Sequence, residues 1–375
     1  MIAPTPFFSD RGCHVRILEE ARALERAGAT VAICTYFLGD TPEALTVHRA
    51  GGIPGYHKRS AGPAWGKLAL DARLWNTVRR VEREFQPQVL HAHLHEGMAI
   101  AAALRTRARK VLDVQGSLTE ETLQHGFVPE FARPALERVE RRIVRAAHAV
   151  VTSHDAAAAE LTERFGVPRE RVHVVGDAGT LGPARPERTE ALRAAWNLPA
   201  DAPVVVYAGL LAAHQGTEVL LDLARALERR GKPGIVLAAG YPEAVWRDAA
   251  ESLGLGARIR FTGRFSYLDL PHLLALGTVA VSPKTSATEG NQKLCAYLEA
   301  GLPTVAFATP ASRDILEDSG VLVENGDTPA FVRAVTEVLD QTSFRSALAM
   351  RARVRAAVLG TWDDVARRIV QAYAL

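Results

Sequence analysis

The stretch SPKTSATEGNQKLCAYLEAGLPTVAF occupies residues 282–307 of the 375-residue chain and has the pattern of an α/β protein. It starts at the end of one apolar run, residues 279–282, and ends on a second, residues 304–307. Short apolar runs bounded by turn residues predict buried strands. A polar loop, a helix-length segment and the turn around Gly301 and Pro303 separate the two runs. The stretch therefore predicts a strand–loop–helix–strand unit of an open sheet.

The polar loop of this unit has the composition of a binding loop. In open α/β sheets, ligands bind where the carboxyl ends of strands lead into helices. Gly290 lets the backbone approach a ligand, and the first N–H groups of the following helix can hold an anion. Lys293 adds a positive charge, and Glu289 can accept hydrogen bonds from hydroxyls. Our hypothesis is that this loop binds a sugar nucleotide, which carries both hydroxyls and phosphates.

The length and composition of the chain narrow the class of protein. A chain of 375 residues favours two domains, and a net charge of +3 does not by itself indicate nucleic acid as a partner. Three cysteines are too few for a disulfide framework and indicate reduced thiols. No apolar run approaches the length of a membrane span, and early prolines interrupt any signal-peptide core. We therefore expect a cytoplasmic protein.

The N-terminal end predicts the first repeat of a doubly wound fold. Residues 2–5 predict a strand, residues 13–26 a helix and residues 30–36 a second strand. The loop before the helix contains Arg11 and Gly12 at the carboxyl end of the first strand. We expect this loop to face a ligand, with Arg11 adding positive charge.

Three histidines alternate near the end of a predicted strand at residues 89–94. His91, His93 and His95 are spaced by two, which on a strand puts them on one face. One interpretation puts His93, His95 and Glu96 at a ligand cleft. A second is a metal site, because imidazoles with this spacing can chelate, but no other cluster of ligand residues accompanies them. A third is hydrogen bonding within the core, which fits His91 best.

A basic helix is predicted at residues 65–85. Residues 57–83 contain seven Lys and Arg residues against two acidic ones, with Trp65 and Trp75 among them. The favoured interpretation is a solvated helix with two tryptophans in the core. The alternative is a helix that lies on an anionic membrane surface.

The strand pattern restarts after a segment rich in Pro, Gly, Asp and Arg at residues 181–202, which we predict to be a linker. The predicted strands of the second half are residues 204–208, 235–239, 259–262, 279–282 and 304–308. We predict an N-terminal domain at residues 1–180, a C-terminal domain at residues 203–361, and a helix at residues 362–375 that returns to the first domain. A lone nicotinamide-binding domain is disfavoured, because no G-x-G-x-x-G follows the first strand of either half.

Four segments together resemble glycosyltransferase family 4, the retaining enzymes of GT-B architecture. They are QPQVLHAHLHEG (residues 86–97), VVVYAGLLAAHQGTEVLLDLARAL (204–227), RIRFTGRFSYLDLPHLLALGTVAVSPK (258–284) and TEGNQKLCAYLEAGLPTVAF (288–307). The resemblance covers nearly the whole sequence. It implies two Rossmann-like domains facing a cleft and metal-independent transfer of a sugar from a nucleotide diphosphate. It implies no cofactor beyond this co-substrate, with UDP or GDP as the expected carrier.

Several family positions hold different residues here, which indicates a divergent branch. The family's phosphate-binding Arg and Lys are replaced by Leu210 and Gln215, its second glutamate by about Ala296, its Gly-Gly loop by Arg11-Gly12, and its cleft histidine by Gln115. We expect Lys293 and Arg11 to replace the two lost cations.

The resemblance implies a set of site residues. Catalytic roles are expected for Glu289, Lys293 and His93. Donor binding is expected for Arg11, Gly12, Gly209, Gln215, Gly216, Gly240, Arg264, Phe265, Gly290, Asn291 and Gln292, and the acceptor side for His95, Glu96 and Gln115. No metal ligand is predicted.

The resemblance also implies partners and leaves alternatives. The expected acceptor is a cell-surface polysaccharide, a glycolipid or a small molecule, bound with peripheral contact to the inner membrane face and without nucleic acid. Because the usual Arg, Lys and second Glu are absent, the alternative is a catalytically weak GT-B protein that acts as a binding or partner subunit. A sugar-nucleotide epimerase, a phosphorylase and a metal hydrolase built on His93 and His95 are further alternatives.

Overall fold

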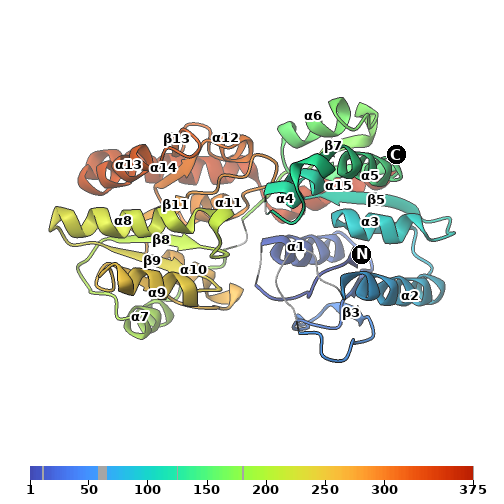
Figure 1. The fold of residues 1–375 in the computed structure, drawn as a ribbon, viewed down its shortest axis with the longest axis horizontal. Coiled ribbons are helices and arrows are strands. Elements are labelled where there is room, and N and C mark those ends of the chain that lie inside the picture. The colour runs from blue at the N-terminus through green and yellow to red at the C-terminus, as the bar shows by residue number, and fades with distance from the viewer. Residues whose placement is uncertain (11, 58–65, 125, 180, 375) are drawn as a thin grey trace. The chain divides into compact units, whose positions relative to one another are not determined.

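The computed structural model describes residues 1–10, 12–57, 66–124, 126–179 and 181–374, and Arg11 therefore lies outside the described residues. The chain forms two compact units, each built on its own parallel sheet (Figure 1). The first unit comprises Met1–Asp177, Thr288–Gly290 and Trp362–Leu375. The second comprises Ala178–Ala287 and Asn291–Thr361.

The sheet of the first unit has seven described strands in the order β3-β2-β1-β4-β5-β6-β7, and all pairs are parallel. The strands are β1 (Ile2–Ala3), β2 (Ala32–Thr35), β3 (Thr46–Arg49), β4 (Val89–His93), β5 (Arg109–Val114), β6 (Ala149–Thr152) and β7 (Val172–Val174). The helices of this unit are α1 (Gly12–Arg26), α2 (Lys67–Phe85), α3 (Leu94–Ala102), α4 (Leu118–Gln124), α5 (Arg133–Arg145), α6 (Asp155–Glu163) and α15 (Trp362–Ala374). Two 3-10 turns, Glu130–Ala132 and Arg169–Arg171, complete the unit.

The two faces of the first sheet differ in chemistry because side chains alternate along each strand. On β4, Leu90 and Ala92 join an apolar core with residues of α2 and α3, such as Leu74 and Met98. The intervening His91 and His93 are also buried, on the opposite face. Helices α1 and α15 pack against each other, and α15 also contacts β5, β6 and β7. This face of the sheet therefore buries polar groups of α1, β4 and β5.

The sheet of the second unit has six described strands in the order β10-β9-β8-β11-β12-β13, again all parallel. The strands are β8 (Val204–Ala208), β9 (Ile235–Ala239), β10 (Ile259–Phe261), β11 (Val279–Ser282), β12 (Thr304–Phe307) and β13 (Val321–Val323). The helices are α7 (Pro186–Ala195), α8 (Thr217–Arg230), α9 (Ala244–Ser252), α10 (Leu270–Leu274), α11 (Lys293–Glu299), α12 (Pro310–Leu316), α13 (Thr328–Asp340) and α14 (Thr342–Leu359). The 3-10 turns Ala213–Gln215 and Tyr267–Asp269 lead into α8 and α10.

Both faces of the second sheet are apolar. Val205 and Tyr207 of β8 belong to one core cluster, whereas Val204, Val206 and Ala208 belong to another. In parallel sheets covered by helices on both faces, the sequence of each strand is a continuous apolar run, as it is in β8. The α/β prediction for this half rested on such runs.

Several predicted boundaries differ from the structure. The edge strands β3 and β13 were not predicted. β3 (TVHR) is only partly buried and lacks an apolar run, and β13 (VLV) is apolar but only three residues long. The predicted linker at residues 181–202 contains α7, which packs against α10 of the second unit. The predicted basic helix begins at Lys67 rather than Trp65, and residues 58–65 lie outside the described residues.

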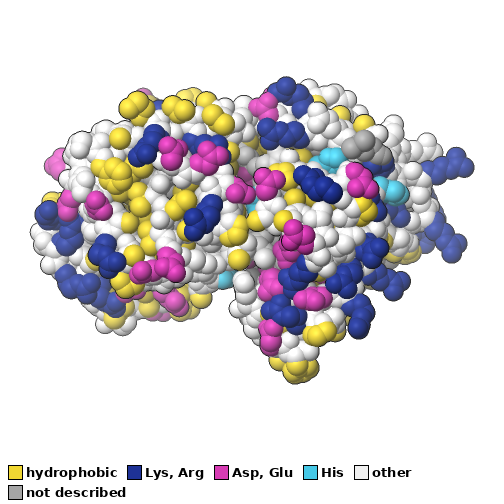
Figure 2. Space-filling model, turned by 90° about the horizontal axis from the view of Figure 1, so that it is seen from above, with side chains coloured by type: hydrophobic (Ala, Val, Ile, Leu, Met, Phe, Trp, Pro, Cys, Tyr) yellow, Lys and Arg dark blue, Asp and Glu magenta, His cyan; other side chains and the backbone are white. Residues whose placement is uncertain are grey.

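Charged side chains of both signs lie interspersed over the face of the molecule drawn in Figure 2, in keeping with the small net charge. All three cysteines are free thiols. Among the residues that the structure describes, no helix is both long and apolar enough to cross a membrane.

Two glycines flank α8, and their surroundings give a matched test of backbone constraint. Gly216 has φ +76°, and a Cβ there would lie 2.1 Å from the Pro283 carbonyl oxygen. Gly231 has φ +61°, with no atom within 4 Å of a Cβ. We expect Gly231→Ala to lower the free energy of unfolding by about 1 kcal/mol, the cost of the left-handed conformation. Gly216→Ala should cost roughly 1–3 kcal/mol more, because the methyl group would clash with the backbone of the donor loop. Urea denaturation of both variants measures this difference, and equal losses would contradict it.

Candidate active site

The candidate site of the second unit lies at the carboxyl ends of β8 and β11. The chain runs outward from β8 to β9 and β10 on one side, and β11 begins the other half of the sheet. Ligands of open α/β sheets bind at this reversal of strand order. The loop after β8 carries Gly209 and Gln215, and the loop after β11 leads to Lys293. The strand order thus brings together two segments that the sequence separates by about seventy residues.

The Lys293 ammonium contacts Gln215 and Tyr207 at this point. Its Nζ donates to Gln215 Oε1 at 3.0 Å and to the Tyr207 hydroxyl at 3.2 Å. It also lies 4.4 Å from the centre of the Tyr207 ring, a cation–π geometry. The Tyr207 hydroxyl in turn donates to the Leu210 carbonyl oxygen at 2.6 Å. Lys293 is therefore positioned beside Gly209, where a Cβ would lie 3.0 Å from Nζ.

The backbone segments after β8 and β9 are closely packed beside this lysine. A Cβ at Gly240 would lie 1.7 Å from the Gly209 carbonyl oxygen, so only glycine fits there. The Gly209 N–H donates to the Ala239 carbonyl at 2.9 Å. The predicted glycines at these positions are thus required by the protein's own packing.

The Asn291 side chain belongs to a buried hydrogen-bond network at the end of β11. Its side chain is buried, and its amide donates to the hydroxyls of Ser282 and Ser312 at 3.0 and 3.1 Å. The Thr309 hydroxyl caps α12 by accepting from the Ser312 N–H at 3.2 Å. Asn291 therefore fastens the donor loop to the end of β11 and to the start of α12, and its amide is occupied by these bonds.

The remaining predicted donor residues are distributed over both units. Arg264 is exposed and Phe265 half-buried after β10, where Phe265 packs on the apolar core. Gln292 directly precedes α11 and is half-buried. Glu289 and Gly290 are also half-buried, and they belong to the first unit with Thr288.

Two residues of this site were not singled out from the sequence. Lys284 follows β11 by two residues, and its side chain is buried in the same loop. A lysine at the carboxyl end of an apolar strand was an available signal. Tyr207 gave no signal, because an aromatic residue inside a strand is ordinarily part of the core.

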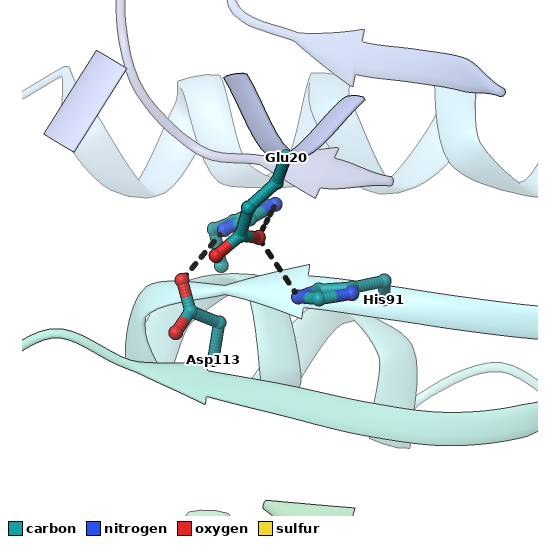
Figure 3. Close-up of side chains that lie close together, drawn as sticks. Glu20, His91 and Asp113 are labelled. Atoms are coloured by element: carbon teal, nitrogen blue, oxygen red, sulfur yellow. Dashed lines mark hydrogen bonds and ion pairs between the residues drawn. The ribbon is translucent and has the colours of Figure 1, made fainter. Parts of the chain in front are cut away.

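The candidate site of the first unit contains a buried ionic cluster around Arg16. The Arg16 guanidinium donates to both oxygens of Asp113, at 3.0 and 3.1 Å, and to Asp177 Oδ1 at 2.5 Å. It also pairs with Glu20 Oε1 at 2.9 Å. Figure 3 shows Glu20 of α1 pointing toward His91 of β4, beside Asp113 of β5. All these side chains are buried, so one guanidinium faces three carboxylates in the interior.

Burial and charge displace the protonation equilibria of this cluster. Burial raises the pKa of Glu20 well above its usual value, against the lowering effect of Arg16. Burial would also raise the pKa of Asp113, but the Arg16 charge and the His93 hydrogen bond hold it well below its usual range. Burial lowers the pKa of both His91 and His93, so the two imidazoles are neutral.

His95 and Glu140 form a separate buried pair. His95 Nε2 lies 3.1 Å from Glu140 Oε1, and Glu140 also accepts the N–H groups of Leu118 and Thr119 at 2.9 Å. Glu140 thus holds the first turn of α4. Burial opposes the charge of His95, but its hydrogen bond to Glu140 prevails and raises the pKa of His95. The same interactions outweigh burial and lower the pKa of Glu140 to about 2.

The predicted placement of the histidines is wrong in two respects. His95 does not share a strand face with His91 and His93, because β4 ends at His93 and α3 begins at Leu94, where φ is +62°. The side chains of His93 and His95 are 0% and 5% exposed, so neither lies on an accessible surface as expected of a ligand cleft. His93 instead bonds Asp113 Oδ2 through Nδ1 at 3.0 Å.

Glu96 and Gln115 are half-buried rather than enclosed. Glu96 pairs with Lys67 of α2 at 3.1 Å, and Lys67 donates to the Tyr36 hydroxyl at 3.1 Å. The Gln115 amide donates to Asp113 Oδ2 at 3.0 Å, which links the loop after β5 to the ionic cluster. Gly12 is the first residue of α1, and a Cβ there would meet nothing within 4 Å.

Comparison with known proteins identifies the family. A model described as a glycosyl transferase 4-like domain matches residues 11–178, and one described as glycosyl transferases group 1 matches residues 202–341. The chain is 30% identical to an alpha-D-kanosaminyltransferase of Streptomyces kanamyceticus, over 77% of each chain. It belongs to the family 4-like glycosyltransferases.

Two further similarities support this family and its fold. A D-inositol 3-phosphate glycosyltransferase of Nocardioides sp. is 28% identical to this glycosyltransferase, over 96% of its chain and 84% of the relative's. The structure of Anabaena Alr3699/HepE in complex with UDP-glucose superposes with a TM-score of 0.76 at 16% identity, over 99% of this chain and 97% of that one. The predicted GT-B fold is thereby confirmed. The alternative of a catalytically weak partner subunit finds no support, because the similar proteins are transferases.

The His95–Glu140 pair predicts how the stability of the glycosyltransferase depends on pH. Because the folded pKa of His95 is raised above its usual 6.5, the stability from its protonation is present below pH 6.5 and is lost as pH rises through the folded pKa. Because the pKa of Glu140 is lowered to about 2, its contribution is present above its usual 4.5 and is lost toward pH 2. We expect His95→Asn to cost about 3 kcal/mol at pH 5.5, the lower end for breaking a buried pair, and clearly less at pH 9.

Chemical denaturation of the wild type and His95→Asn at the two pH values measures this difference. Glu84→Ala is the matched control for the loss of an ion-paired side chain, because Glu84 is 60% exposed and pairs with Arg80 at 3.4 Å. It should change stability by less than about 0.5 kcal/mol at either pH. An equal effect of His95→Asn at both pH values would show that the histidine is not protonated in the folded state.

Proposed function

We propose that this glycosyltransferase transfers a sugar from a UDP- or GDP-sugar to a hydroxyl of a carbohydrate or lipid-linked acceptor, with retention of configuration and without a cofactor. The observation that carries the proposal is the position of Lys293. Its ammonium is fixed at the strand-order reversal of the second sheet, where α/β proteins bind nucleotides. The family's usual Arg and Lys are absent, and Lys293 supplies a cation beside the positions that they would occupy, Leu210 and Gln215.

In the proposed reaction, the acceptor oxygen forms a bond to the anomeric carbon of the donor sugar while the bond from that carbon to the diphosphate breaks. The acceptor proton passes to the departing diphosphate oxygen on the same face of the sugar, which gives retention. Negative charge develops on the diphosphate, and fixed cations stabilise it electrostatically. Lys293 supplies this charge, with Lys284 of the same loop as a second cation. Glu289 and Gly290 are proposed to contact the donor sugar and its phosphates, and Gly209, Gly216 and Gln215 to line the diphosphate.

The similar proteins support a nucleotide-sugar donor. Structures of Anabaena HepE are complexes with UDP-glucose, with UDP and glucose, and with UDP. That protein shares the overall fold of this chain. One of the named relatives is a D-inositol 3-phosphate glycosyltransferase, and its name indicates a small polar acceptor. We therefore include a small molecule among the proposed acceptors.

Helix α2 is the part of the chain proposed to contact an anionic membrane. It exposes Arg79, Arg80 and Arg83 on one side, and Leu68 is 83% exposed near its first turn. Trp75 is half-buried against the apolar core, and the Arg79 guanidinium lies over its ring at 5.4 Å. The contact proposed is therefore electrostatic, since this tryptophan is part of the core.

The role of Lys293 is tested by Lys293→Met, which keeps the length of the side chain and removes its charge. We expect nucleotide diphosphate affinity to fall roughly tenfold or more, because a hydrogen bond to a charged group is lost. We expect kcat/KM to fall by roughly 100-fold, since the lost charge acts on the leaving group. Isothermal titration with UDP, GDP, ADP and dTDP, with and without EDTA, measures the first quantity and names the base.

Lys232→Met is the matched control, because Lys232 belongs to the same unit, pairs with Asp340 at 3.2 Å and is 61% exposed. It should bind and turn over the donor like the wild type. A Lys293→Met enzyme as active as this control would refute the assigned role of Lys293. A wild type that binds none of the four diphosphates would refute the proposed donor class.

A further inference from the structure

The ionic cluster of the first unit contains three side chains whose polar atoms converge without hydrogen bonds. They are Glu20 of α1 and His91 and His93 of β4, and all three are at least 98% buried. Among the described residues, Glu20 Oε2, His91 Nε2 and His93 Nε2 have no hydrogen-bond partner. A buried polar atom without a partner costs free energy and calls for a ligand that the protein alone does not supply.

The spacing of these atoms is that of a metal site that is slightly expanded. Glu20 Oε2 lies 3.7 Å from His91 Nε2 and 4.0 Å from His93 Nε2. Ligand atoms of Glu20, His91, His93 and Asp113 all lie within 4.8 Å of one another. Bonds of about 2.0–2.1 Å to a tetrahedral Zn²⁺ put neighbouring donor atoms roughly 3.3 Å apart. The two distances from Glu20 Oε2 exceed that spacing by about 0.4 and 0.7 Å, a difference that small side-chain movements remove.

The other polar atom of each side chain is held by the protein. His91 Nδ1 bonds the Tyr373 hydroxyl at 2.6 Å, and His93 Nδ1 bonds Asp113 Oδ2 at 3.0 Å. The rings are stacked with centroids 4.6 Å apart, and both Nε2 atoms lie within 4.0 Å of Glu20 Oε2. Metal-binding histidines are usually oriented in this manner, by a carboxylate or another group on the far nitrogen. Glu20 Oε1 is held by Arg16 at 2.9 Å, which leaves Oε2 for a ligand.

Asp113 orients the other side chains rather than completing the ligand set. Both of its oxygens accept from Arg16, and Oδ2 also bonds His93 and Gln115. Arg16 supplies one positive charge against the carboxylates of Glu20, Asp113 and Asp177. A divalent cation would therefore balance the ionised cluster, whereas the protein's own groups leave an excess of negative charge.

We propose that Glu20 Oε2, His91 Nε2 and His93 Nε2 bind a divalent transition-metal ion, and that the ion is structural. Two imidazoles and one carboxylate suit Zn²⁺ better than Mg²⁺ or Ca²⁺, which prefer oxygen ligands. Because the ligands are buried, the ion fastens α1 to β4 and reaches no substrate. The site does not depend on the proposed function, since none of its ligands belongs to the second unit.

The test uses the full chain without a polyhistidine tag. The protein is dialysed against a chelator under mildly denaturing conditions, refolded, and titrated with Zn²⁺ in competition with a chromophoric chelator. We expect one equivalent per chain and a rise in Tm on addition of Zn²⁺. Replacement by Co²⁺ should give the visible absorption of a low-coordinate site with nitrogen and oxygen ligands.

Two variants remove one ligand atom each while keeping the outer contacts. Glu20→Gln preserves the shape of the side chain, and His91→Asn preserves an acceptor or donor near Nδ1 for Tyr373. Each should bind Zn²⁺ at least roughly 100-fold more weakly and lose the Tm rise. His57→Asn is the control, because His57 is an exposed histidine of the same unit, and it should bind like the wild type.

Circular dichroism verifies that each variant is folded. If a variant does not fold, the Co²⁺ spectrum of the wild type still tests the proposed site. Less than 0.1 equivalent of metal in the wild type, with no Tm rise and no Co²⁺ absorption, would overturn the proposal. So would a folded Glu20→Gln protein with wild-type affinity. Either result would mean that a proton on Glu20, rather than a metal, neutralises the cluster.

Discussion

The buried positive charge of Arg16 is the constraint on which the first unit depends. A guanidinium removed from water is costly unless carboxylates surround it, and Asp113 and Asp177 meet that requirement from β5 and from the segment after β7. These contacts fix α1 on its sheet, where the strand order reverses between β1 and β4. The same carboxylates then orient His93 and Gln115, so the polar side of the sheet is assembled around one charge. Removal of Arg16 or of one carboxylate would leave a buried charge without its partner, so the charges of this cluster stabilise the fold only together.

The second unit differs from the first, because its sheet is apolar on both faces. Here the candidate site lies in the loops at the carboxyl ends of β8 and β11, where backbone packing sets the positions of polar groups. Asn291 fastens one loop to Ser282 and Ser312, and Gly240 allows the neighbouring loops to touch. Lys293 donates to Gln215 and Tyr207, which position its ammonium at this end of the sheet.

The sequence predicted the α/β class and the strong strands, because apolar runs are local patterns. The sequence was a poorer guide to contacts between side chains that come from different helices and strands. Nothing near His93 shows that Asp113 bonds it, since the two residues meet only through the register of β4 with β5. The charged Asp113 inside an apolar strand and the Arg16 and Glu20 pair on one helix face were usable signals, because charges at core positions need partners. The start of α3 at Leu94 was not predictable from alternation, and it alone sends His95 toward Glu140 instead of His93.

The contrast between the two units bears on how this fold accommodates different residues in its loops. The family resemblance implies cations at positions 210 and 215, and the Leu210 and Gln215 found there do not alter the buried strands that define the sheet. A lysine in the first turn of α11 reaches the same end of the sheet from the adjacent strand connection, because β8 and β11 are neighbours. The Gln215 amide oxygen accepts from Lys293. Under the proposed function, this single hydrogen bond couples the position where the resemblance implies a cation to the lysine that supplies the charge.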